Sequence, residues 1–252
     1  MNKLHVYLPC YNEEGNIRQL TEEWLAEDGE LRQQGYQLCI TGVDDKSTDN
    51  TLSILQALAE QHSAVSVIAH AVNKNLGGVL MTSIRNFFEV SAADDIMCFM
   101  DADNTHKPRF VKSMLAKLPS LGAQACVIAS RYQPGAGVQG LTKDRERLSD
   151  LAKLYYSMML HVPNVQDYTC GYRIYTRQAL AKAWDKYKER LIERQSFACM
   201  MELLYKLHKS GCQFAEVPFQ LYYDDKEGES KMRIAKTIRD SLLTALELRF
   251  LS

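Results

Sequence analysis

The chain has 252 residues, of which 46% are hydrophobic and 24% are charged, which is typical of a globular protein and excludes intrinsic disorder. Its 30 lysine and arginine residues nearly balance 31 aspartate and glutamate residues, and this net charge of -1 argues against a nucleic-acid-binding protein. The seven cysteines are scattered and form no CxxC pair, which predicts free thiols in a reducing compartment.

The N-terminal segment MNKLHVYLPCYNEE lacks the long apolar core and the cleavage site of a secretory signal. No run approaches the roughly 18 consecutive apolar residues of a membrane-spanning helix. We therefore expect a cytoplasmic location. Any membrane contact is expected to be peripheral on the inner face of the membrane, or to depend on a segment missing from this chain.

Up to about residue 130, short apolar runs alternate with amphipathic stretches, which predicts an α/β fold with a mostly parallel sheet flanked by helices. The predicted strands are 3–9, 37–43, 65–70, 95–100 and 124–129, and the predicted helices are 13–27, 50–61, 78–90 and 107–118. Asp49 and Pro108 suit the first turn of the second and fourth of these helices.

Beyond residue 130 the glycine-rich segment QPGAGVQG predicts a loop that leads into a helix at 147–160. A polar turn at 167–171, helices at 176–190 and 194–209 and a short strand at 214–217 follow. The last segment is a basic amphipathic helix, so we divide the chain into a domain at 1–230 and this helix at 231–252. The helix is expected either to lie on an anionic membrane surface or to pack on the domain.

The strongest chemical signal is Asp101-Ala102-Asp103, directly after the apolar run DIMCFM. Two carboxylates at the end of a strand suit a divalent cation such as Mg²⁺ or Mn²⁺, which then bridges to phosphate oxygens. The alternative is a solvated acidic turn that caps the next helix. His106, just beyond, either supports the metal ligands or caps that helix.

Two more polar loops follow predicted strands. Asp44 and Asp45 end the run CITGV, and the loop PCYNEE follows the first strand with an aromatic ring and hydrogen-bonding groups for a base and a ribose. Each loop alone suits an ordinary turn. Three such loops at the carboxyl edge of one sheet predict a nucleotide site.

The ordered motifs LPCYNEEGNI, VDDKSTDNT, NLGG, MDADNTHKP, SRY, DYTCGYR and EGESKM resemble those of glycosyltransferase family 2, from about residue 3 to 235. Within that family they are similar to the dolichyl-phosphate mannose synthase and polyprenyl-phosphate glycosyltransferase branch. The resemblance implies a GT-A fold and an inverting, metal-dependent transfer of a sugar from a GDP- or UDP-linked donor. The favoured acceptor is a polyprenyl (dolichyl or undecaprenyl) phosphate, and the alternative is a saccharide hydroxyl in cell-surface glycan synthesis.

The resemblance also implies roles for individual residues. The nucleotide sugar would contact Pro9, Tyr11, Asn12, Glu13, Asp44, Asp45, Asp101, Ala102 and Asp103. Asp101 and Asp103 would hold the metal, while Arg131 and Lys231, the latter next to Ser230, would lie near the phosphates. The element from Asp167 through Gly171, Tyr172 and Arg173 would lie near the sugar and the acceptor.

A hydroxyl acceptor needs a base, whereas a lipid phosphate is already anionic. Asp167 is the first candidate base, with Glu202 behind it, and the alternative for Asp167 is an acid that satisfies backbone N–H groups in a turn. Three departures from the family pattern stand out. Lys46 replaces the usual glycine, Thr105 replaces a frequent metal-binding glutamine, and the arginine common before the GESK segment is missing.

Two hypotheses from other classes are a nucleotide-sugar-binding protein without turnover and a nucleotidyltransferase. The intact acidic pair and Lys231 oppose the first. The second lacks a glycine-rich, basic nucleotide loop in the first strand-helix turn.

Overall fold

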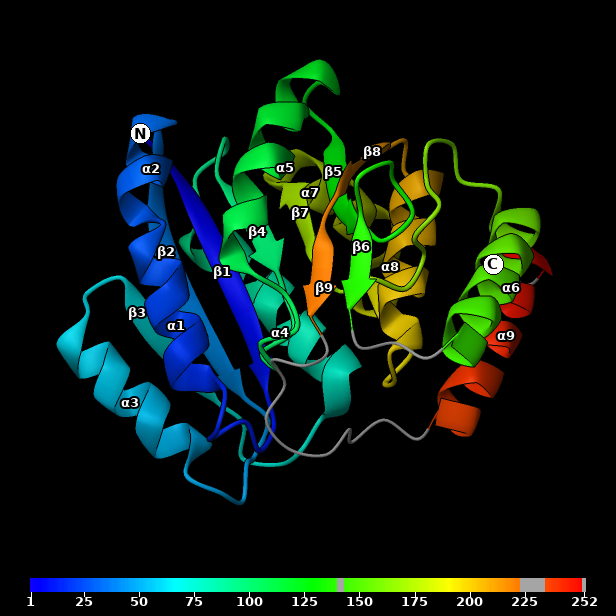
Figure 1. Cartoon of the computed structure of the whole chain (residues 1–252). Helices are drawn as coiled ribbons and strands as arrows, with labels where there is room; N and C mark the ends of the chain where they lie inside the picture. Colours follow the sequence, from blue (N-terminus) through cyan, green and yellow to red (C-terminus); the bar gives the residue numbers. More distant parts are fainter. Residues whose placement is uncertain (140–142, 223–233, 251–252) are drawn as a thin grey trace.

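A seven-stranded sheet with strand order β3-β2-β1-β4-β7-β5-β8 forms the centre of the protein (Figure 1). This computed structural model describes residues 1–139, 143–222 and 234–250, and side chains at 1–138, 150–221 and 239–250. The strands of this sheet are β1 (Asn2–Cys10), β2 (Tyr36–Asp44), β3 (Val65–Ala69), β4 (Ile96–Phe99), β5 (Ala125–Ser130), β7 (Arg173–Thr176) and β8 (Gln213–Pro218). Only β7 runs antiparallel to its neighbours within this sheet, so the predicted mostly parallel architecture is confirmed.

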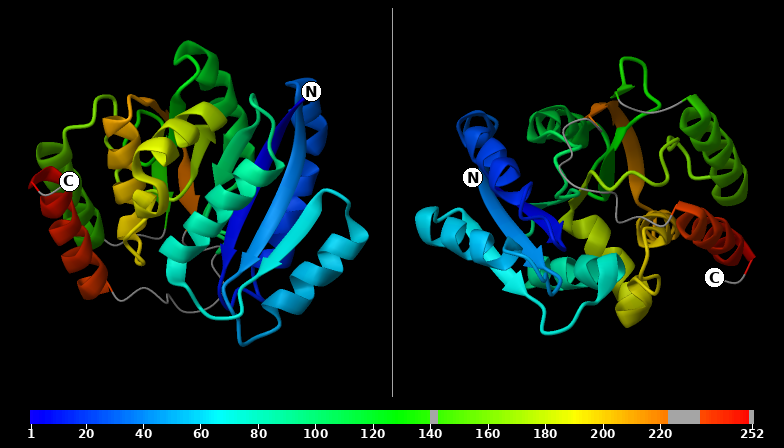
Figure 2. Two further views of the ribbon diagram at one scale, coloured as in Figure 1. Left: turned by 180° about the vertical axis from the view of Figure 1, so that it is seen from behind. Right: turned by 60° about the horizontal axis from the view of Figure 1, so that its bottom comes forward.

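Helices cover both faces of the sheet. They are α1 (Ile17–Ala26), α2 (Asp28–Gln33), α3 (Thr51–Gln61), α4 (Asn75–Val90), α5 (Val111–Lys117), α6 (Lys143–Leu160), α7 (Arg177–Tyr187), α8 (Ala198–Lys209) and α9 (Ile234–Phe250). In Figure 1, α1 and α5 lie in front of the sheet, while α4, α7 and α8 lie behind it, as the reverse view in Figure 2 shows. Helix α9 packs against α6 and α8 at one edge of the molecule. Within the described ranges, no helix has the length and apolarity to cross a bilayer.

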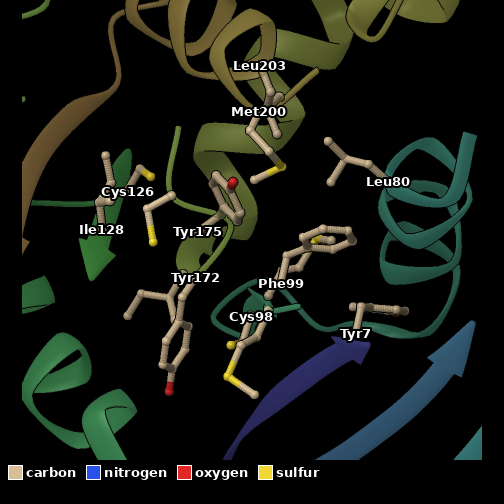
Figure 3. Packing of buried hydrophobic residues seen from close by; sticks show 14 of the residues in the cluster. Tyr7, Leu80, Cys98, Phe99, Cys126, Ile128, Tyr172, Tyr175, Met200 and Leu203 are labelled. Atoms are coloured by element: carbon tan, nitrogen blue, oxygen red, sulfur yellow. The ribbon is translucent and has the colours of Figure 1, made fainter. Parts of the chain in front are cut away.

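The core lies between the sheet and these helices because the central strands are apolar on both faces. Every residue of β4 and β5 is buried. Figure 3 shows Tyr7, Phe99 and Tyr175 from three strands packed near Leu80 of α4 and Met200 of α8.

The main difference from the sequence prediction is β7, which was not predicted. Its sequence RIYT begins with a charged residue, and Arg173 is completely buried. The Arg173 guanidinium donates to the carbonyls of Met200 at 2.6 Å and Tyr168 at 2.8 Å. Strand β7 was therefore not recognised in the sequence, because a run of apolar residues is the usual sign of a buried strand and this one begins with arginine.

Smaller differences concern short elements and the ends of helices. Helix α2 and the two-stranded sheet of β6 (Gly137–Gln139) and β9 (Gln220–Tyr222) were also not predicted. Helix α1 begins later than predicted, because residues 11–16 form a turn. The N-cap of α3 is Asn50 and not Asp49, but the Asp49 carboxylate accepts the Thr51 N–H at the start of the helix, as expected. Pro108 opens a short 3-10 helix (Pro108–Phe110) as expected.

Asp95 ties the start of β1 to the start of β4. Its buried carboxylate accepts the N–H groups of Lys3 at 2.7 Å and Ala92 at 2.8 Å, and lies 3.2 Å from His5 Nε2. Burial acts to raise the pKa of Asp95, but the hydrogen bonds and the His5 ring outweigh it and lower the pKa below its ordinary value.

We expect Asp95→Asn to lower the free energy of unfolding at pH 7 by about 1–3 kcal/mol, because it removes a charge-assisted hydrogen bond from a buried site. Since the folded pKa of Asp95 is lowered, its stabilisation is present above the unfolded pKa and is lost as pH falls below about 4. Urea unfolding at pH 7 and at pH 3 should therefore show a smaller acid effect in the variant. The control is Asp94→Asn at an exposed neighbour, and equal stability of the two variants would contradict the assignment.

Candidate active site

The three polar loops expected to form a nucleotide site lie side by side at the carboxyl edge of the sheet. Strand β1 lies between β2 and β4, and Cys10 at its end is opposite Asp44 at the end of β2. The Met100 N–H donates to the Tyr7 carbonyl at 3.2 Å, which places the following Asp101 next to the end of β1. The topology therefore brings together residues that are up to about ninety positions apart in the sequence.

Hydrogen bonds join the first loop to the second. Asn12 adopts a left-handed φ of 55°, and its Oδ1 accepts the Thr48 N–H at 2.7 Å. The Asn12 N–H donates to Ser47 Oγ at 3.0 Å, and the Glu13 N–H donates to Thr51 Oγ1 at 2.7 Å. Asn12 and Glu13 thus shape the loop, while the Tyr11 side chain is exposed beside them.

The two adjacent aspartates of the second loop have different surroundings. Asp45 Oδ1 accepts the Lys74 N–H at 2.7 Å and lies 2.7 Å from His70 Nδ1, so Asp45 holds the segment that leads into α4. Asp44 Oδ1 is buried and has no hydrogen-bond partner among the described residues. A buried carboxylate oxygen without a donor is costly, so this atom suits N–H or O–H donors of a ligand. Of the two predicted contacts to the base or ribose, the geometry favours Asp44.

Thr105 and His106 contact the carboxylates of the acidic pair. The Thr105 hydroxyl donates to Asp103 Oδ1 at 2.6 Å. His106 Nδ1 lies 3.1 Å from that hydroxyl and 4.0 Å from Asp101 Oδ2. The His106 ring stacks on Phe219 with centroids 5.3 Å apart. The N-cap of the 3-10 helix that follows is Lys107, and the contacts of His106 with Thr105 and Asp101 favour its role in supporting the carboxylates.

Gly171 leaves room for the Asp101 carboxylate. A Cβ at position 171 would lie 2.8 and 2.9 Å from the two Asp101 oxygens, closer than such atoms approach in proteins. The glycine cradle and the two carboxylates fit a hard divalent cation that takes its other ligands from phosphate and water. Among the described residues there is no cluster of three or more histidine, cysteine or acidic side chains that would form an all-protein metal site.

Arg131 and Asp167 form a buried ion pair. Arg131 Nε donates to Asp167 Oδ2 at 2.8 Å, and Arg131 Nη2 donates to Oδ1 at 2.6 Å. The Cys170 N–H also donates to Asp167 Oδ1, at 3.0 Å, and Glu216 accepts the Asp167 N–H at 2.7 Å. Burial acts to raise the pKa of Asp167, but the Arg131 charge and its hydrogen bonds lower it below the ordinary value. Asp167 is therefore charged and fully buried, as expected of an acid that anchors the turn leading to Gly171.

Several other residues that were predicted for the site are buried and make hydrogen bonds to other parts of the protein. Glu202 is buried and accepts the N–H groups of Glu193 at 2.9 Å and Arg194 at 2.8 Å. Tyr172 is buried, and its hydroxyl donates to the Pro108 carbonyl at 3.0 Å. The roles of Asp167 and Glu202 as a base stay predictions, although internal donors already occupy both carboxylates. Ser230 and Lys231 lie outside the described residues.

Two site residues were missed in the sequence, Phe219 under His106 and Glu216 under the turn at 166–167, and the contact of the predicted Gly171 with Asp101 was not foreseen. Only the glycine was part of a motif. The other two reach the site from β8 and the residue that follows it, the far side of the sheet, so no local pattern marks them.

Lys46 has a left-handed φ of 64°, a backbone conformation that glycine adopts without strain. A side chain with Cβ is strained in this region, by about 1–2 kcal/mol. The Lys46 side chain is exposed, so no packing offsets the strain.

We expect Lys46→Gly to raise the free energy of unfolding by about 0.5–1 kcal/mol, because relief of strain exceeds the added entropy of the unfolded chain. Chemical denaturation is the measurement. Lys46→Ala is the matched control, since it removes the charge but keeps the Cβ. If alanine stabilised the protein as much as glycine, side-chain charge and not backbone strain would be the cause.

Comparisons with known proteins agree with this geometry. Residues 5–184 match the profile described as Glycosyl transferase family 2. A polyprenol monophosphomannose synthase from Mycolicibacterium smegmatis is 27% identical over 244 residues, which cover 96% of this chain and 85% of that protein. A dolichol-phosphate mannosyltransferase from Saccharomyces cerevisiae is 30% identical over 234 residues, which cover 90% of this chain and 80% of that protein.

Solved structures share the fold at low sequence identity. One is a glucosyl-3-phosphoglycerate synthase from Mycobacterium tuberculosis, crystallised with Mn²⁺, UDP and glucosyl-3-phosphoglycerate. Its TM-score is 0.68 at 18% identity, and the matched region covers 100% of this chain and 81% of that protein chain. A mannosyl-3-phosphoglycerate synthase from Rubrobacter xylanophilus has a TM-score of 0.65 at 14% identity, with coverages of 99% and 74%. The predicted GT-A fold is thus confirmed, and the family match and the relatives together show that the chain belongs to glycosyl transferase family 2 and is a glycosyltransferase.

Proposed function

We propose that this glycosyltransferase moves a sugar from a GDP- or UDP-linked donor to a polyprenyl phosphate, with inversion and with Mg²⁺ or Mn²⁺. The observation that carries the proposal is the acidic pair after β4, with Asp101 held against Gly171, at the same edge of the sheet as the unpaired Asp44 oxygen at the end of β2. The names of the two sequence relatives given above support a polyprenol or dolichol phosphate acceptor. Crystals of structural neighbours with Mn²⁺ or Mg²⁺ support the metal.

The donor lies across the carboxyl edge of the sheet. Asp44 Oδ1 accepts a hydrogen bond from the base or ribose, and the exposed Tyr11 ring covers that part of the ligand. Asp101 and Asp103 would hold the cation, while the Thr105 hydroxyl fixes one Asp103 oxygen. A divalent cation bound there stabilises the negative charge that develops on the leaving diphosphate.

The turn from Asp167 to Gly171 shapes the acidic pair. Arg131 neutralises Asp167 inside the protein, and the Cys170 N–H bond closes the turn just before Gly171. We therefore place Arg131 in this supporting role. Its sequence-based role near the phosphates, and that of Lys231, remain part of the proposal.

The surroundings of Asp167 and Glu202, the two carboxylates considered as bases, favour an acceptor that is already anionic and needs no base. Asp167 and Glu202 both accept several internal hydrogen bonds, and the pKa of Asp167 is lowered, which makes it a weak base. A lipid phosphate attacks the anomeric carbon without losing a proton, from the face opposite the leaving group. Such a substrate also agrees with a cytoplasmic protein that contacts the inner face of the membrane.

The acceptor is tested with purified protein, Mg²⁺ and a series of GDP- and UDP-sugars that includes GDP-mannose. We expect sugar transfer to a short-chain polyprenyl phosphate and none to oligosaccharides, measured by mass spectrometry of the extracted lipid. Transfer to oligosaccharides alone would overturn the lipid acceptor and support the glycan alternative. Donor binding without any transfer would support a binding protein.

The acidic pair is tested with Gly171→Ala. Because the new Cβ displaces the Asp101 carboxylate, we expect the transfer rate to fall about a hundredfold and Mn²⁺ binding in the presence of the nucleotide to weaken. Isothermal titration calorimetry measures the binding separately from turnover. Gly29→Ala is the matched control because a Cβ at position 29 meets nothing within 4 Å. If the two variants bound Mn²⁺ equally well, the acidic pair would not be the metal site.

A further inference from the structure

Two buried histidines each lie against a buried aspartate, at opposite ends of the central strands. His5 Nε2 is 3.2 Å from Asp95 Oδ2, near the amino ends of β1 and β4. His70 Nδ1 is 2.7 Å from Asp45 Oδ1, and these two residues directly follow β3 and β2 at the carboxyl edge. The first pair is therefore at the edge away from the candidate active site, whereas the second adjoins Asp44.

His70 joins three segments of the chain. Its N–H donates to the Asp44 carbonyl at 2.9 Å, which connects the end of β2 with the residue after β3. Its ring lies between Asp45 and Thr82 of α4, with Nε2 2.9 Å from the Thr82 hydroxyl. Without this ring, the buried Asp45 carboxylate would lose a donor and the loop would lose its bond to α4.

The contacts define which His70 nitrogen carries the proton. Asp45 Oδ1 accepts the Lys74 N–H at 2.7 Å, so this oxygen is an acceptor and His70 Nδ1 donates to it. In the neutral ring, Nε2 then accepts the proton of the Thr82 hydroxyl. Both ring nitrogens are thus satisfied, and His70 is a directed hydrogen-bond donor to Asp45.

The peptide group between the two aspartates is held on both sides. Its carbonyl, from Asp44, accepts the His70 N–H, and its N–H, from Asp45, donates to the Cys10 carbonyl of β1 at 2.8 Å. Holding this peptide and the Asp45 side chain also fixes the backbone that carries Asp44, whose buried Oδ1 has no partner among the described residues. A group that is ordered before its ligand arrives binds with a smaller entropic cost.

We propose that His70 is a positioning residue for the donor nucleotide. It holds Asp45 and the preceding peptide, and so keeps Asp44 Oδ1 in place to accept a hydrogen bond from the base or the ribose. This role rests on the proposed function, because it needs a nucleotide donor. Strands β2 and β1 separate the end of β3 from the end of β4, so metal binding by the acidic pair and the chemical step should not depend on His70.

The test compares three substitutions of His70 in the purified full chain, with nucleotide affinity measured by calorimetry with GDP and with UDP, each with Mg²⁺. We expect His70→Ala to weaken binding of the nucleotide that the wild type accepts about tenfold, the effect of one hydrogen bond to a charged group. His70→Asn should stay within about threefold of wild type, because its amide nitrogen is attached to the same carbon as Nδ1. His70→Gln, whose amide extends one atom farther, should resemble alanine.

His5→Ala is the matched control, since it removes the other buried contact between histidine and aspartate. It should lower the unfolding temperature but leave nucleotide affinity within about twofold of wild type, because Asp95 is at the opposite edge. In transfer assays, His70→Ala should raise KM for the donor about tenfold and leave kcat within about twofold. Equal loss of affinity in the two alanine variants, or no recovery with asparagine, would indicate a general structural effect and overturn the positioning role.

A double-mutant cycle tests whether His70 acts through Asp44. In an Asp44→Ala background, His70→Ala should weaken nucleotide binding by no more than about twofold further, because the group that it positions is gone. If the two single losses multiplied instead, His70 would not act through Asp44 and the proposal would be wrong.

Thermal unfolding confirms that each variant is folded. Nucleotide binding that depends on His70, without sugar transfer to any polyprenyl phosphate, would overturn the proposed acceptor but not this role. Transfer by the wild type, together with a donor KM that His70→Ala leaves unchanged, would overturn this role alone.

Discussion

The carboxyl edge of the sheet gathers several aspartates, and their mutual repulsion must be offset locally for the active site to exist. One of these compensations is the ion pair of Arg131 with Asp167, whose carboxylate is fully buried. Removing one partner of such a pair leaves an uncompensated buried charge, which typically costs about 3–5 kcal/mol. The turn that ends at Gly171 is therefore held firmly, and Gly171 in turn sets the position of the Asp101 carboxylate.

The remaining aspartates divide into those used for structure and those suited to ligands. Asp45 is occupied by the Lys74 N–H and the His70 ring, and one Asp103 oxygen accepts from Thr105. Asp44 keeps a buried oxygen with no partner in the described residues. At this edge of the sheet, Asp45 and one Asp103 oxygen thus accept hydrogen bonds from the protein. A nucleotide sugar and a cation would supply the donors and the positive charge that the other oxygens lack.

Helix α6 contacts both the residues around Arg131 and helix α9 at the edge of the fold. Lys153 connects α6 to the residues around Arg131, and α9 packs along α6. The predicted C-terminal helix packs on the domain, which was one of the two alternatives that its amphipathic pattern suggested, and contact with a membrane stays a prediction. It packs on the domain through Ala245 and Leu248, and it leaves Leu243, Leu246 and Phe250 on the surface. The predicted division of the chain at residue 230 stays a prediction.

Local patterns were enough for much of this protein. The alternation of strands and helices, the acidic pair after β4 and the family could be predicted from the sequence, because periodicity, turns and ordered motifs are encoded over short stretches. The fold was needed to show that Arg173 lies in a buried strand, that Asp45 has protein partners while one Asp44 oxygen has none in the described residues, and that Asp167 anchors a turn. It also decided that Gly171 lies against Asp101. Each of these depends on partners brought from distant parts of the chain, and burial and hydrogen bonding are set by those partners and not by the residue alone.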